Sequence, residues 1–158
     1  MAVAATIAAG ASGATERAAI RSPDFTVRTV SGKSFRLSAQ RGKVVVFDFL
    51  VPSCGECQVE APLLDRAAQR FGTRGLRVLV LDVGQSPDRE LVSFYYGQLG
   101  LRHVAVAADT RLRVARRYGV TLLGTTVIVG RDGSRLWQGT WFGHEKDLFR
   151  LIARALVT

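Results

Sequence analysis

Apolar residues along this chain fall into short runs, and these runs predict the strands of a sheet. Two runs, Lys43 to Leu50 and Leu76 to Val83, are almost continuously apolar, which is typical of central strands covered on both faces. Two pairs of shorter runs surround Ser31-Gly32-Lys33 and Arg131-Asp132-Gly133 and predict hairpins. The shorter strands are Phe25 to Val30, Ser34 to Leu37, Val104 to Ala107, Thr125 to Val129 and Arg135 to Thr140.

Apolar residues spaced three or four apart predict four helices. The first runs from Cys54 to Phe71, with Val59 and Leu63 on its inward face, and we expect Pro62 to kink it. The others are Asp88 to Leu99 after Ser86-Pro87, Thr110 to Tyr118, and Glu145 to Val157 with Leu148, Leu151, Ile152 and Leu156 inward.

The order of these elements predicts the architecture. A hairpin is followed by alternating strands and helices, then by a second hairpin and a closing helix. Such alternation implies parallel crossovers, so the fold class is α/β, with a central mixed β-sheet flanked by helices on both faces. We expect residues 23–158 to form one domain.

Residues 1–22 are expected to form a flexible tail or the remnant of a signal or anchor. Ala2 to Ala11 is apolar, but it is only ten residues long and no Lys or Arg precedes it. The sequence leaves both possibilities open.

The chain is basic, with 22 Lys or Arg against 13 Asp or Glu in 158 residues and a formal net charge of +9. Such an excess can indicate a nucleic-acid partner or an anionic membrane. The arginines are scattered, however, and only Arg111, Arg113, Arg116 and Arg117 cluster, without an aromatic-rich basic motif beside them. We therefore predict a solvated basic surface and no nucleic-acid partner.

The only two cysteines follow the first central strand, in Cys54-Gly55-Glu56-Cys57. Their spacing places both sulfurs on one side of the first helical turn, close enough to bond. A thiol at a helix N-terminus also meets unpaired N–H groups and the positive end of the helix dipole, which favour the thiolate. The pattern indicates thiol–disulfide exchange, with Cys54 as the exposed nucleophile and Cys57 as the shielded resolving cysteine.

Two structural roles are the alternatives to exchange chemistry for this cysteine pair. The pair could form a permanent disulfide or half of a zinc site, but His103 and His144 lack the spacing of a zinc finger. By default, each histidine is a surface or loop residue.

Several motifs together resemble the thioredoxin superfamily, and within it the TlpA/ResA-like extracytoplasmic thiol–disulfide oxidoreductases. Cys54 to Pro62 and the leucine that follows are similar to the pattern C-x-x-C-x-x-E-x-P-x-L of that group. The other matching motifs are Pro23-Asp24-Phe25, Gly42-Lys43-Val44-Val45-Val46, Tyr118-Gly119-Val120 and Thr125 to Gly133. The resemblance covers Pro23 to Leu156 and implies a thioredoxin-like fold with an N-terminal β-hairpin extension.

Two positions depart from the family pattern. Val51-Pro52-Ser53 stands where the family usually has a tryptophan, and Gly124 stands where it has a cis-proline. In thioredoxin-like proteins this loop binds the substrate strand, so the resemblance assigns substrate binding to Leu123, Gly124 and Thr125. Because a non-proline cis bond costs about 2.5–4 kcal/mol, we expect a trans Leu123–Gly124 bond and a looser loop suited to a dedicated partner.

Three acidic residues are candidates for supporting the cysteines. Asp48 lies in an otherwise apolar strand, where thioredoxins carry a buried aspartate, and burial would raise its pKa and let it exchange a proton with Cys57. The alternative for Asp48 is a carboxylate satisfied at a strand end. Glu56 and Glu60 are candidates for redox tuning, since negative charge raises a thiol pKa and favours a reducing protein. Both could equally be solvated residues that help the helix begin.

These features predict a thiol–disulfide oxidoreductase, more a reductant than an oxidant, without a metal or other cofactor. The predicted partners are protein thiol or disulfide substrates and an upstream electron donor. We expect a monomer outside the bacterial cytoplasm, with a membrane tether as one option; a cytoplasmic place stays open.

The sequence also leaves three alternative functions open. A Sco-like copper chaperone would use both cysteines and His144, although that family spaces its cysteines as CxxxC. A peroxide-reducing enzyme would need Thr or Ser where Val51 stands. A thioredoxin-fold interaction module without activity draws support from Gly124.

Overall fold

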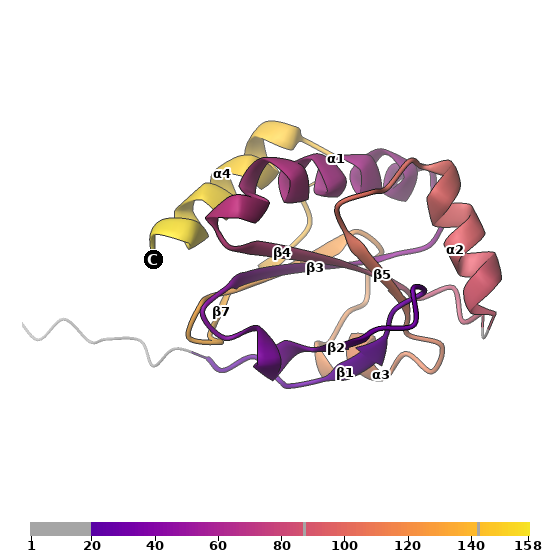
Figure 1. Ribbon diagram of the computed structural model, residues 1–158, viewed down its shortest axis with the longest axis horizontal. Helices are drawn as coiled ribbons and strands as arrows, with labels where there is room; N and C mark the ends of the chain where they lie inside the picture. Colours follow the sequence, from indigo (N-terminus) through magenta and orange to yellow (C-terminus); the bar gives the residue numbers. More distant parts are fainter. Residues whose placement is uncertain (1–19, 87, 142) are drawn as a thin grey trace, which may run out of the picture.

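The computed structural model describes residues 20–86, 88–141 and 143–158, and its middle layer is a five-stranded sheet (Figure 1). The strand order is β5-β4-β3-β6-β7. β3 is parallel to β4 and β4 is parallel to β5, whereas β6 is antiparallel to both β3 and β7, so the sheet is mixed as predicted. The strands are β3 (Val44–Leu50), β4 (Leu76–Asp82), β5 (Ala105–Ala108), β6 (Thr125–Val129) and β7 (Arg135–Gly139).

Helices cover both faces of this sheet, which confirms the predicted α/β class (Figure 1). One face carries α1 (Gly55–Phe71), α2 (Arg89–Gln98) and α4 (Glu145–Val157). The other face carries the hairpin layer, which we define as β1 (Thr26–Arg28), β2 (Ser34–Arg36) and the short α3 (Arg113–Arg117). Two 3₁₀ turns, Leu37–Gln40 and Gly72–Arg74, complete the elements.

The central strand β3 is buried along its whole length, which explains its continuous apolar run. Successive side chains of a strand point to opposite faces, so β3 contributes to two separate cores. Val44, Val46 and Leu50 pack beneath the helices α1 and α4, whereas Phe47 and Phe49 pack against the hairpin layer. Asp48 has the parity of Val46 and Leu50, which places its side chain on the face that carries α1.

Aromatic rings hold the hairpin layer to the sheet. The ring of Phe47 lies 5.2 Å from the ring of Phe25 and 5.0 Å from that of Tyr118, both in edge-to-face geometry. The Tyr118 hydroxyl also donates a 2.6 Å hydrogen bond to the carbonyl of Pro23. The N-terminal hairpin is therefore an integral part of the core and not a loose extension.

The structure corrects one predicted core residue and several predicted ends. Val59 is 57% exposed, so its expected place on the inward face of α1 was wrong. The helix runs unbroken through Pro62, and Cys54 caps it instead of lying within it. The α3 helix begins only at Arg113 because the Asp109 carboxylate binds the N–H groups of its first turn. Pro87, expected to start α2, lies outside the described residues.

Within the described part of the chain, no helix has both the length and the apolar character that crossing a bilayer requires. The backbone of Ile20 and Ser22 bonds to Arg135 and Gly133, beside the β6–β7 turn.

We predict that replacing Phe47 with Ala lowers the free energy of unfolding by about 3–5 kcal/mol, because the ring is fully buried between the hairpin layer and the sheet. Phe94, which is 59% exposed on α2, provides the matched control. Replacing Phe94 with Ala should cost less than about 1 kcal/mol in the same urea titration. Equal losses would show that the ring cluster does not hold the hairpin layer.

Candidate active site

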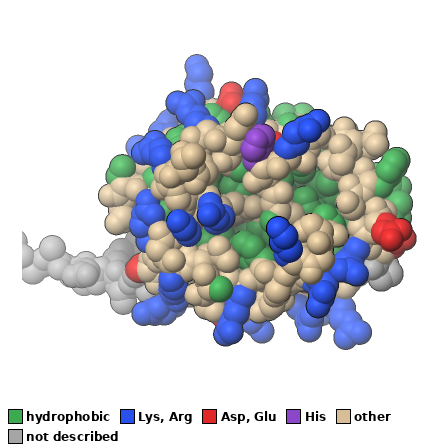
Figure 2. Space-filling model, in the orientation of Figure 1, with side chains coloured by type: hydrophobic (Ala, Val, Ile, Leu, Met, Phe, Trp, Pro, Cys, Tyr) green, Lys and Arg blue, Asp and Glu red, His purple; other side chains and the backbone are tan. Residues whose placement is uncertain are grey.

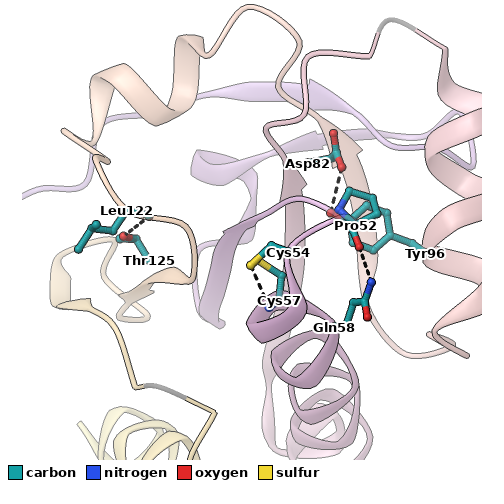
Figure 3. Close-up of a disulfide and its surroundings, with 8 residues drawn as sticks. All are labelled: Pro52, Cys54, Cys57, Gln58, Asp82, Tyr96, Leu122 and Thr125. Atoms are coloured by element: carbon teal, nitrogen blue, oxygen red, sulfur yellow. Dashed lines mark hydrogen bonds between the residues drawn. A yellow bond between two sulfur atoms is a disulfide. The ribbon is translucent and has the colours of Figure 1, made fainter.

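Cys54 and Cys57 form a disulfide at the start of α1, with 5.2 Å between their Cα atoms (Figure 3). The strand β3 ends at Leu50, and the chain turns through four residues before the helix begins. Cys54 is the N-cap residue, and its sulfur accepts a 3.2 Å hydrogen bond from the N–H of Cys57. A thiolate formed at Cys54 would receive the same N–H bond and lie at the positive end of the helix dipole.

The two sulfurs differ in their access to solvent. Cys57 is only 2% exposed and packs in the core beneath α1, whereas Cys54 is half-buried. The loop before Cys54 is held by Gln58, whose side-chain amide donates a 2.8 Å bond to the carbonyl of Pro52 (Figure 3). A partner sulfur can therefore approach Cys54 more readily than Cys57. Glu56, between them, is exposed in the first helical turn.

Asp48 is fully buried on β3, opposite Thr126 of β6. One carboxylate oxygen accepts a bond from the Thr126 hydroxyl, and that hydroxyl oxygen accepts a 2.8 Å bond from the indole N–H of Trp141. The second oxygen has no hydrogen-bond partner among the described residues. Burial raises the pKa of Asp48 to about 6, although the bonds from Thr126 and Trp141 oppose this rise.

Glu60 lies one turn after Cys57 and is also buried, at 3% exposure. Burial and, after it, the negative charge of Asp48 raise its pKa to about 7, while the N–H of Gly143 opposes the rise. Its oxygen Oε2 has no hydrogen-bond partner within the described residues. Glu60 is thus a desolvated group, unlike Glu56, although the sequence placed both glutamates in one class.

Gly124 lies against the carboxylate of Glu60. A Cβ atom at position 124 would come within 2.6 Å of Glu60 Oε2, and the glycine has a φ of +73° that other residues rarely adopt. The backbone N–H of Gly124 donates a 2.9 Å bond to the carbonyl of Phe49. The bare glycine therefore makes room for the buried carboxylate, a link that the sequence did not reveal.

The loop expected to bind substrate adjoins this carboxylate. Leu123 is 44% exposed, whereas Gly124 and Thr125 are buried. The Thr125 hydroxyl donates a 2.7 Å bond to the carbonyl of Leu122, and Figure 3 shows both residues on the loop apart from the disulfide. The described residues contain no cis peptide bond, so the prediction of a trans Leu123–Gly124 bond is confirmed.

A further buried carboxyl, which sequence reasoning missed, lies on the other side of the disulfide loop. Asp82 ends β4 and accepts a 3.0 Å bond from the hydroxyl of Tyr96 (Figure 3). Burial raises the pKa of Asp82. It lines a cavity of about 530 Å³ together with Pro52, Ser53 and Gln58. A lone acid at the end of an apolar run was the signal in the sequence.

The two histidines occupy different structural settings. His103 Nδ1 lies 2.9 Å from the Asp65 carboxylate, which also accepts the N–H groups of residues 102–104. His144 precedes the first turn of α4 as its N-cap residue. Trp141 is buried at the Asp48 site, where its indole N–H bonds the Thr126 hydroxyl.

The chain is similar in sequence to proteins named as thiol-disulfide oxidoreductases. The chain is 28% identical over 111 residues, 70% of its length, to the thiol-disulfide oxidoreductases ResA of Geobacillus thermodenitrificans and Bacillus subtilis. The matched part covers 62% and 60% of those two proteins, so the chain spans less than two thirds of these curated relatives.

A solved structure agrees with the fold. The crystal structure of a Chlorobium tepidum protein assigned as thiol:disulfide interchange protein DsbE matches with a TM-score of 0.79 at 25% identity, covering 87% of this chain and 96% of that one. The predicted thioredoxin-like fold, with its additional N-terminal two-stranded sheet, is confirmed. The sequence profile of the AhpC/TSA family, a group within the thioredoxin superfamily, matches residues 20–134. Since this match runs from the start of the described chain to the β6–β7 turn, the chain belongs to the AhpC/TSA family.

Proposed function

We propose that this protein is a thiol–disulfide oxidoreductase that exchanges electrons with disulfides of other proteins. The observation that carries the proposal is the asymmetry of the disulfide: Cys54 is half-buried at a helix N-terminus, whereas Cys57 is buried one helical turn before the buried Glu60. The similarity to proteins named ResA and DsbE supports the same chemistry. Protein thiols and disulfides are then its substrates.

The reaction runs in two exchange steps when the protein acts as a reductant. The Cys54 thiolate attacks one sulfur of the substrate disulfide, so a mixed disulfide forms and the other substrate sulfur leaves as a thiolate. Cys57 then loses its proton and attacks Cys54, which releases the second substrate thiolate. The substrate gains two electrons, the Cys54–Cys57 disulfide re-forms, and a dithiol donor must reduce it again.

We propose that one of the buried carboxyl groups takes the Cys57 proton. Glu60 follows Cys57 by one helical turn, and Asp48 faces the same core from β3. Because the pKa values of both groups are raised toward neutrality, either carboxylate can accept a proton near pH 7. We assign this base role to Asp48, because its pKa of about 6 leaves it mostly ionised at pH 7, whereas Glu60, with a pKa of about 7, is half protonated there. Glu60 then tunes the pKa of both Asp48 and the thiols.

A reducing role follows from the acidic surroundings of the cysteines. Glu56 is exposed beside Cys54, and Glu60 is buried beyond Cys57, so negative charge opposes a thiolate on both sides. A less stable thiolate makes the reduced form a stronger electron donor. We infer a monomer that works outside the cytoplasm with an upstream dithiol donor, and the loop Leu123-Gly124-Thr125 contacts the substrate.

The cysteine roles predict which single variant traps a substrate. In Cys57→Ser, Cys54 should attack 5,5′-dithiobis(2-nitrobenzoate) and hold it as a stable mixed disulfide, seen as added mass on the intact protein. In Cys54→Ser, the buried Cys57 should react at least about tenfold more slowly. Iodoacetamide should label Cys54 first in the reduced wild-type protein. Faster reaction of the Cys54→Ser variant would reverse the two roles.

The raised carboxyl pKa values predict how stability depends on pH. The Glu60 carboxyl ionises near 4.5 in the unfolded chain but at about 7 in the folded protein. Between these values the folded protein keeps a proton that the unfolded chain has lost, so the free energy of unfolding falls as pH rises. Asp48 acts in the same direction between 3.8 and about 6.

Urea denaturation of the oxidised protein across this pH range measures the effect without interference from thiols. The loss should reach at most about 1.4 kcal/mol per pH unit for each proton. Glu60→Gln and Asp48→Asn should each flatten the curve, whereas the exposed Glu56→Gln should leave its slope unchanged. A wild-type stability that rises from pH 4.5 to 7 would contradict the assigned pKa shifts.

Removal of the Glu56 charge should make the protein slightly more oxidising. Glu56→Gln takes a negative charge away from the Cys54 thiolate, which lowers the thiol pKa and stabilises the reduced form. An exposed charge is worth about 0.2–1 kcal/mol, so the reduction potential should rise by about 5–20 mV. Equilibration with glutathione measures it. A wild-type potential near −270 mV or below identifies a reductant, and one near −120 mV would contradict that direction.

A further inference from the structure

Five arginines line one cavity between the hairpin layer and the start of α2. The cavity measures about 480 Å³ and is lined by Arg28 of β1, Arg89 at the start of α2, and Arg111, Arg113 and Arg117 in and before α3. Figure 2 shows Lys and Arg side chains gathered over the lower right of the molecule, where Figure 1 places β1 and α3. This set of residues is called the arginine cavity below.

The arginine cavity contains one carboxylate, which is already engaged. Asp109 is buried, and its two oxygens accept the N–H groups of Arg113, Val114 and Ala115 at 2.9–3.0 Å. Within the described residues, none of the five arginines forms an ion pair. The lining therefore has a formal net charge of +4, carried by five arginines that are exposed to solvent.

The geometry of α3 increases this excess of charge. Arg113 and Arg117 lie four residues apart on the same helix face, where like charges repel each other. Phe25 and Val114 add two buried apolar residues to the lining of the cavity. An anion between the arginines would relieve the repulsion and meet several donors at once.

The excess of positive charge arises from two segments of the chain and not from its whole length. Residues 20–43 and 109–135, which form the hairpin layer and the adjoining loops with β6, hold twelve Lys or Arg and three Asp. Residues 44–108 and 136–158, which carry the cysteines, hold nine Lys or Arg and nine Asp or Glu. The entire formal charge of +9 thus arises from the first two segments.

Arginines that reach a cavity from three separate segments fit a tetrahedral anion better than a planar one. A single guanidinium can satisfy both oxygens of a carboxylate in one plane. A phosphate group presents at least three oxygens in different directions and accepts bonds from several guanidinium groups. The cavity also lies beyond the carboxyl end of β5, the edge at which ligands bind in many α/β sheets.

We propose that the arginine cavity, where Arg28, Arg89 and the three α3-side arginines converge, binds phosphate groups of a soluble molecule or a lipid headgroup. The proposal does not rest on the redox function, although Asp109 of the cavity donates its backbone N–H to the carbonyl of Asp82, 2.7 Å away. Bound phosphate would also neutralise arginines such as Arg111, Arg113 and Arg117, for which the sequence predicted only a solvated surface.

Titration of the full chain with inorganic pyrophosphate, followed by calorimetry and amide NMR shifts, tests this proposal. Arg113→Gln/Arg117→Gln should weaken binding by at least about tenfold. The matched control is Arg150→Gln/Arg154→Gln, which removes two charges at the same spacing from α4 and should change the affinity less than twofold. Arg89→Gln is a second test from the opposite wall, since Arg117 also bonds the hairpin backbone at Asp24.

Sedimentation with vesicles of phosphatidylcholine and phosphatidylglycerol distinguishes the two sources. Pyrophosphate binding that depends on Arg113 and Arg117 supports a soluble phosphorylated ligand. Vesicle binding with the same dependence, but without pyrophosphate binding, supports a lipid headgroup. Equal weakening by the α4 control would overturn the proposal, since attraction would follow net charge alone. Binding of a polyglutamate peptide without either phosphate probe would also overturn it and point to an acidic protein.

Discussion

The site depends on the removal of two carboxyl groups from water. Asp48 and Glu60 share the core beneath α1, where two negative charges would repel each other and where each charge costs solvation. Both pKa values therefore rise toward neutrality, which places proton carriers beside the resolving cysteine. Burial thus makes Asp48 and Glu60 suitable for proton transfer near neutral pH. The same burial lowers the free energy of unfolding as the pH rises above about 4.5.

The alternation of β3 explains how one strand can serve two different layers. Its even-numbered residues, with Asp48 among them, face α1 and the cysteines. Its odd-numbered residues, such as Phe47, face the aromatic core and the hairpin layer. The side chains near the cysteines and those that anchor the hairpin layer therefore lie on opposite faces of β3. The formal charge is also divided unevenly along the chain, because residues 44–108 and 136–158 are neutral while residues 20–43 and 109–135 carry +9.

Local patterns in the sequence were sufficient to predict the central strands of the fold and part of the candidate site. Continuous apolar runs gave β3 and β4, and the cysteine spacing gave the capped start of α1. Val59 was misplaced because periodicity alone does not show where the apolar face of a helix ends. The contact between Glu60 and Gly124, and the convergence of Arg28 with Arg113, join residues distant in sequence, and such pairs become visible only once the chain is folded.

The contact between Gly124 and Glu60 also restricts the order in which this sequence can change. At this backbone conformation, a side chain at position 124 and a carboxylate at position 60 compete for the same space. A shorter residue at 60 would open that space first, whereas a side chain gained first at 124 would push a buried carboxylate aside. The effects of the two substitutions are therefore not additive, and one order of mutation is more accessible to evolution than the other.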